Sequence, residues 1–114
     1  MRKVESQIVS LIKDFREREV TGRQQLTKRD RIDGENGKVS VRLWNTEIAL
    51  VLKGQMVLNS GGYRTPTTKS RLNALLQGMG SNWRIYQQNF QWWLRSTRVP
   101  VKRRFLDGIT IEIQ

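Results

Sequence analysis

The chain has 114 residues, no cysteine, no histidine and a net charge of +11, with 21 Lys and Arg against 10 Asp and Glu. This length predicts one domain, 1–114, with a single modest core. Without cysteine and histidine the chain lacks disulfides, thiolate metal sites and the commonest general base. Because its few acids lie mostly before residue 38, clustered carboxylates for metal-dependent hydrolysis are not expected. We therefore expect a protein that is not an enzyme and holds no cofactor or metal.

The excess of positive charge indicates a negatively charged partner, such as nucleic acid, anionic lipid or an acidic protein. The alternative is that the charge serves solubility alone. No apolar run is long enough to span a membrane, and the N-terminus lacks the apolar stretch of a signal peptide. We therefore expect a cytoplasmic protein with no membrane partner.

Apolar residues recur at helical spacing near the N-terminus and predict an amphipathic helix over residues 3–19 that packs on a sheet. The residues of this apolar stripe are Val4, Ile8, Leu11, Ile12 and Phe15. Residues 20–37 carry three glycines among alternating charges and few apolar groups. This composition is typical of an exposed loop.

Alternation of apolar and polar residues predicts strands from residue 38 onward. Three strands joined by short turns, at 38–43, 48–52 and 56–58, form an antiparallel meander. A central helix follows at about 67–78, with Thr65-Pro66 fitting an N-cap followed by proline, and Thr67 as an alternative cap.

The last third of the chain returns to strands, at 83–87, 90–94 and 109–113, and Asp107-Gly108 is a hairpin turn signal before the final one. The sequence therefore predicts an α+β fold. Its parts are an antiparallel sheet of five or six strands, an N-terminal amphipathic helix and one central helix, with both helices on one face of the sheet.

The segment between the meander and the central helix combines two glycines, several hydroxyls and three cations. Helix N-termini carry unpaired N–H groups and a partial positive charge, so an anion is stabilised there. The motif is neither a Walker A loop nor a dinucleotide fingerprint, and a plain strand-to-helix turn is the alternative. The candidate phosphate ligands are Gly61, Gly62, Arg64, Thr67, Thr68, Lys69 and Arg71, with Tyr63 as a candidate for stacking on a base.

A second cluster of cations lies near the C-terminus without an acid among them. Arginine side chains pair well with phosphates, and each neutralised phosphate adds salt dependence to binding. A charged edge strand that blocks aggregation is the alternative. The candidate phosphate ligands here are Arg95, Arg98, Lys102, Arg103 and Arg104.

Trp92 and Trp93 are adjacent, so on a strand their side chains point to opposite faces of the sheet. Phe90 has the same parity as Trp92, and we expect both to point inward. An outward Trp93 is then available to stack on a base or to anchor a partner subunit.

The run at 58–76 contains Gly-Gly-Tyr-Arg-Thr-Pro-Thr-Thr-Lys-Ser-Arg-Leu-Asn, and the run at 85–94 is rich in aromatic residues. Together they resemble a family of small accessory proteins of tailed bacteriophages and prophages. In that family a Gly-aromatic turn leads into a Thr-Thr-Lys-x-Arg-Leu-Asn helix start. The resemblance covers about residues 39–114 and implies a phage accessory role in the bacterial host cell, such as nucleic-acid handling or countering a host defence. It assigns no site residue.

These observations favour a non-enzymatic protein that binds phosphate-bearing ligands, foremost nucleic acid without strong sequence specificity. The alternative is an anti-defence inhibitor or sponge that sequesters a nucleotide signal or blocks a host nucleic-acid-binding protein. A structural virion component and Lys- or Arg-based phosphoryl chemistry are weaker alternatives. The expected partners are nucleic acid or a nucleotide, with a host defence protein and a second copy of the chain as further candidates.

Overall fold

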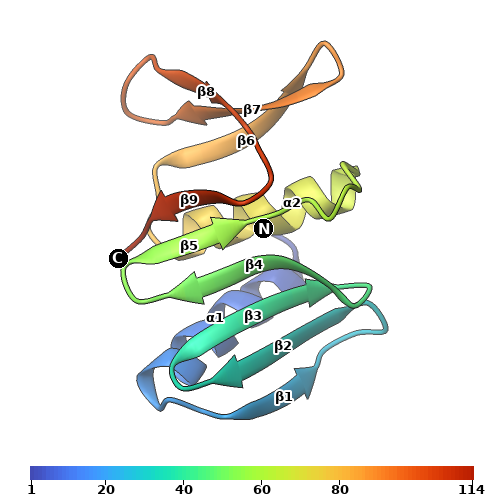
Figure 1. Ribbon diagram of the computed structural model, residues 1–114, viewed down its shortest axis with the longest axis vertical. Coiled ribbons are helices and arrows are strands. Elements are labelled where there is room, and N and C mark those ends of the chain that lie inside the picture. The colour runs from blue at the N-terminus through green and yellow to red at the C-terminus, as the bar shows by residue number, and fades with distance from the viewer.

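The computed structural model describes residues 1–114 as two helices and two antiparallel sheets (Figure 1). In chain order the elements are α1 Lys3–Glu17, β1 Gly22–Gln25, β2 Asp30–Glu35, β3 Lys38–Leu43, β4 Thr46–Leu52, β5 Gln55–Leu58, α2 Pro66–Gly78, β6 Trp83–Gln88, β7 Gln91–Ser96, β8 Lys102–Arg104 and β9 Ile109–Glu112. The larger sheet has six strands in the order β1-β2-β3-β4-β5-β9, and the smaller has three in the order β6-β7-β8. The predicted α+β fold, with an N-terminal helix and one central helix, is confirmed.

Both helices lie on one face of the six-stranded sheet (Figure 1). Helix α1 packs against β2, β3 and α2, and α2 packs against β4 and β6. The predicted apolar stripe of α1 is buried at Ile8, Ile12 and Phe15. The helix ends at Glu17, two residues before the expected end, and Glu19 has a φ of 50°, a value that no α-helix accepts. Neither helix has the length and apolar character needed to cross a bilayer.

The prediction that 20–37 is an exposed loop is wrong, because β1 and β2 lie there and extend the larger sheet. In β2 the inward positions are Asp30, Ile32 and Gly34, so only one of them is apolar. Asp30 is buried through an ion pair with Arg71. A Cβ on Gly34 would lie 2.8 Å from Cδ2 of Phe15, so glycine is needed for α1 to pack here. Hydrophobic alternation therefore does not reveal this strand.

Strands β6 and β7 form the second sheet with β8 and do not join the meander. The bend at Asp107-Gly108 is not a hairpin, because the chain leaves the small sheet after β8 and the next strand, β9, pairs with β5 of the larger sheet. The Asp107 carboxylate accepts the Ser60 amide at 2.7 Å, which ties this bend to the loop after β5. Asn73 of α2 holds the free edge of β6 by pairing with both backbone groups of Ile85, at 2.9 and 2.7 Å.

Phe90 does not point inward but is 95% exposed, which corrects the expectation from its parity with Trp92. Asn89 and Phe90 form the two-residue turn between β6 and β7, with φ values of 52° and 61°. Positive φ at both central residues is the mark of a tight hairpin turn. Phe90 is therefore a turn residue, and the strand begins at Gln91. Trp92 is buried as expected, edge-on to Phe105 at a centroid separation of 5.5 Å.

Candidate functional site

The outward face of the small sheet gathers cations and aromatic rings into two adjacent rows. In an antiparallel ladder, residues that pair directly have their side chains on the same face. Arg95 pairs with Lys102 in one row, and Trp93 pairs with both Tyr86 and Arg104 in the next. We call these five residues the basic-aromatic face. Trp93 thus lies on the outward side of the sheet, as expected from its adjacency to the buried Trp92.

On this face the cations lie over the rings. Lys102 Nζ is 4.5 Å from the centroid of the Trp93 ring, and Arg95 Cζ is 5.4 Å from that of Tyr86. Such contacts fix the side chains without neutralising their charge. Neither these cations nor Arg104 forms an ion pair with a carboxylate, and β6, β7 and β8 contain no acidic residue. The basic-aromatic face therefore retains its full positive charge.

Other cations of the C-terminal cluster lie elsewhere. Arg103 is on the opposite side of the small sheet, with its Cζ 5.5 Å from the centroid of the Trp83 ring. Arg98 is exposed in the turn between β7 and β8, where its amide donates to Ser96 Oγ. Arg84 begins the first row but turns its guanidinium to the carbonyls of Ser81 and Trp83, at 2.8 and 2.6 Å, and burial lowers its pKa. Of the five cations expected to form one patch, three share the face.

The glycine-rich loop does not present the amides expected of a phosphate cradle. The amide of Ser60 donates to Asp107, that of Gly61 to Asn59 Oδ1 at 3.0 Å and that of Gly62 to Ser60 Oγ at 3.2 Å. The amide of Tyr63 donates to the Ser60 carbonyl at 3.1 Å. All four donors are used within the protein, so Gly61 and Gly62 serve the turn.

The start of α2 is similarly occupied. Thr65 is the N-cap, and its Oγ1 accepts the Thr68 amide at 3.2 Å. Thr68 is buried, whereas Thr67 and Lys69 are half-buried. Arg64 turns away from the helix mouth and lies over the rings of Trp92 and Phe105, 5.6 Å from each centroid. These side chains therefore do not converge on one anion site.

Arg71 cannot contact an external phosphate, which corrects its assignment as a ligand. It is 2% exposed, and its guanidinium binds Asp30 through Nε at 2.8 Å and Glu5 through Nη1 at 2.9 Å. Burial alone would raise the pKa of both carboxyl groups. For Glu5, hydrogen bonds from Ser70, the Arg2 amide and Arg71 outweigh burial and lower the pKa below its usual 4.5.

For Asp30, hydrogen bonds from Arg71 and Thr27 outweigh burial and lower the pKa below its usual 3.8. The three buried charges link α1, β2 and α2. Arg71 is therefore part of the core. No group of three or more acidic side chains lies close enough together to hold a metal ion.

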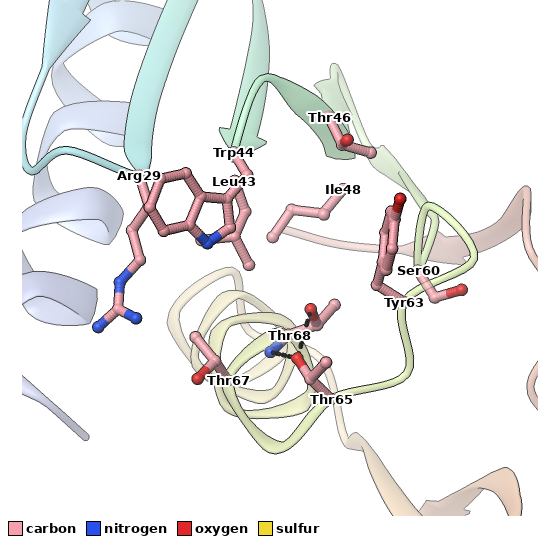
Figure 2. A pocket seen from close by; sticks show the side chains of 10 residues that line it. All are labelled: Arg29, Leu43, Trp44, Thr46, Ile48, Ser60, Tyr63, Thr65, Thr67 and Thr68. Atoms are coloured by element: carbon pink, nitrogen blue, oxygen red, sulfur yellow. Dashed lines mark hydrogen bonds between the residues drawn. The ribbon is translucent and has the colours of Figure 1, made fainter.

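A pocket of about 540 Å³ lies beside the mouth of α2 (Figure 2). Trp44 and Tyr63 stand on opposite sides of it, with the side chains of Leu43 and Ile48 behind and threonines of α2 below (Figure 2). Arg29 is the charged residue of the lining. Tyr63 was expected to contribute to a site, whereas Trp44 and Arg29 were missed. The sequence signal that could have revealed Trp44 is its position directly before Asn45 in a tight turn, where a large aromatic side chain is exposed.

The fold and these surfaces together define a small, strongly basic α+β protein with an unpaired cationic sheet face. The chain belongs to the Kyanoviridae Gp96 protein family, a bacteriophage family whose model matches residues 1–112. This match confirms that the chain belongs to a bacteriophage protein family. No curated protein and no solved structure matches the chain.

Proposed function

We propose that this phage protein binds nucleic acid without strong sequence specificity, through the basic-aromatic face of the small sheet. The observation that carries the proposal is the unpaired state of Arg95, Lys102 and Arg104 on one face, next to the ring of Trp93. Cations that keep their charge neutralise backbone phosphates, and aromatic rings stack on bases of any sequence.

The geometry of the face favours a strand laid across it. Neighbouring strands of a sheet lie about 4.8 Å apart, so the cations of β7 and β8 offer closely spaced contacts along one direction. Lys102 covers part of the Trp93 ring, and it would have to move when a base stacks there. Unpaired cations contact phosphates, and rings stack on the faces of bases of any kind, so we expect sequence to be read weakly.

The test is a titration of a fluorescent single-stranded oligonucleotide, followed by anisotropy between 50 and 300 mM salt. Each phosphate contact contributes about −0.7 to the slope of log affinity against log salt for a single strand. With three cations engaged, we expect a slope of about −2, and Lys102→Glu should reduce its magnitude by about one contact. The same composition in a scrambled sequence should bind with similar affinity, whereas the duplex should bind more weakly because its bases are not free to stack on Trp93.

Lys53→Glu is the matched control, because Lys53 is equally an exposed, unpaired lysine but lies in the turn between β4 and β5. It changes the net charge by the same amount away from the face. If Lys53→Glu weakens binding as much as Lys102→Glu, the interaction follows total charge and the face is not the site. Binding that does not respond to salt would reject the proposal as a whole.

The alternative role, in which the protein sequesters a nucleotide signal, would use a different part of the molecule. The pocket between Trp44 and Tyr63 is the observation that favours it.

A further inference from the structure

We propose that the pocket between Trp44 and Tyr63 binds a planar aromatic ring of nucleobase size. We call it the ring pocket, bounded by Trp44, Tyr63, Leu43, Ile48 and Arg29. Trp44 and Tyr63 are 66% and 68% exposed, whereas Phe15, Trp92 and Phe105 fill the core. Two exposed rings beside one hollow offer ring surface on which a planar ligand can stack.

The Trp44 side of the pocket is held in place at a conformational cost. Trp44 and Asn45 form the turn between β3 and β4 with φ values of 52° and 64°, and the Trp44 amide donates to the Arg29 carbonyl at 2.7 Å. The left-handed region is unfavourable for a bulky side chain. Phe90 has the same conformation in the turn between β6 and β7, so the cost belongs to the tight turn. At Trp44 the turn fixes the direction in which the ring leaves the backbone.

The Tyr63 side is held by the glycine-rich loop. A Cβ on Gly61 would collide with Thr46 Cγ2, and Gly61 has a φ of 67°. Glycine thus lets the loop lie directly on β4, and the Tyr63 amide closes the loop by donating to Ser60. Both aromatic side chains therefore project from backbone that the fold has already fixed. Such preorganisation lowers the entropy cost of binding a ligand.

The lining is suited to a ring more than to an anion. The amides of the glycine-rich loop are used internally, and Arg71 is paired in the core. Arg29 is the one charged group of the lining, and it shares its charge with Asp30 at 3.9 Å. Hydroxyls supply the remaining polar contacts, so stacking and neutral hydrogen bonds carry recognition here.

The volume of about 540 Å³ lies within the range of roughly 300–1,000 Å³ typical of small-molecule sites. It accommodates a base with its sugar. The ring can come from a free nucleoside or nucleotide, or from an unstacked base of a nucleic-acid strand. The pocket is built from the β3–β4 turn, the glycine-rich loop and α2, so it is separate from the basic-aromatic face.

The test uses the indole N–H signals of the tryptophans in ¹⁵N NMR spectra, with the Trp44 signal assigned from Trp44→Phe. The probes are adenosine, AMP, ribose 5-phosphate and a short single-stranded oligonucleotide. We expect adenosine and AMP to shift the Trp44 signal and ribose 5-phosphate to leave it unmoved. A shift with the oligonucleotide alone would also support the ring pocket and would assign the ring to a base within a strand.

Tyr63→Ala should weaken binding of the active ring-bearing probe, followed by the Trp44 signal, about tenfold or more, as expected for loss of a stacking ring. Phe90→Ala is the matched control, since it removes an exposed ring from another hairpin turn. The proposal is overturned if no ring-bearing probe moves the Trp44 signal, if ribose 5-phosphate moves it as much as AMP, or if Tyr63→Ala binds like the wild type. Adenosine carries no charge, so its binding should survive Lys102→Glu, which separates this result from the salt-dependent test.

Discussion

Replacing Arg71 with leucine tests whether this arginine, which the sequence predicted to be a phosphate ligand, instead stabilises the core. The guanidinium joins Asp30 at the start of β2 to Glu5 in α1, and all three side chains are 2% exposed. Arg71→Leu removes three charge-assisted hydrogen bonds, at 2.8, 2.9 and 3.3 Å. It leaves two carboxylates buried beside an apolar side chain.

The loss in the free energy of unfolding depends on the hydrogen bonds that Glu5 and Asp30 retain in the variant. Removing one partner of a buried ion pair costs about 3–5 kcal/mol. Here Ser70 Oγ still donates to Glu5 at 2.7 Å, and Thr27 Oγ1 still donates to Asp30 at 2.6 Å. We therefore expect a loss near the lower end, about 3 kcal/mol, from a total of about 5–15 kcal/mol for a domain of this kind.

Urea denaturation followed by circular dichroism at pH 7 measures this loss directly. Arg104→Leu makes the same chemical change on the exposed face of β8 and should shift the free energy of unfolding by less than about 0.5 kcal/mol. If Arg71→Leu were no more destabilising than Arg104→Leu, the argument that this arginine organises the core would be refuted.

Two further predictions concern pH and backbone strain. The pKa values of Glu5 and Asp30 in the folded protein lie below 4.5 and 3.8. The stability that these carboxylates contribute is therefore complete above about pH 5 and is lost as the pH falls through the lowered pKa values. Urea midpoints measured from pH 7 to pH 2 should fall in acid, and they should fall by less in Arg71→Leu. Phe90→Gly should stabilise the protein by about 0.5–1 kcal/mol, since glycine relieves a left-handed cost of roughly 1–2 kcal/mol against an entropy cost of about 0.5–1 kcal/mol. A lower melting temperature for that variant would contradict the second prediction.

Elements that bury one apolar face were predictable from the sequence. The period-two pattern of 38–58 corresponds to β3 and β5, whose buried positions are apolar. It also locates β4, but there the adjacent Ile48 and Ala49 are both buried and Val51 follows in place of Leu50, because the register shifts at Val41 and Arg42. The helical stripe of α1 and the Thr65-Pro66 start of α2 also agree with the structure. In each case the signal is local, because side-chain direction within one element follows from the period of that element alone.

Strand β2 and the small sheet were not predictable in this way. On the inward side of β2, Asp30 and Gly34 take the place of apolar side chains. Asp30 is buried only because Arg71 of α2 pairs with it, and Gly34 is needed because Phe15 of α1 packs against it. The separation of β6 and β7 from the larger sheet depends on pairing partners, which alternation does not specify. The bend at Asp107-Gly108 sends the last strand to β5 for the same reason.

The features of the candidate site also separate into those that the sequence predicts and those that depend on the fold. Composition and sequence alone determined that the protein is strongly basic, that its C-terminal third carries cations without acids, and that one of two adjacent tryptophans faces outward. Only the tertiary structure decided which cations remain unpaired, because the carboxylates of Arg71 lie 41 and 66 residues away in the chain. It also decided that Trp44 and Tyr63 line one hollow, since the proximity of two turns distant in sequence has no local pattern.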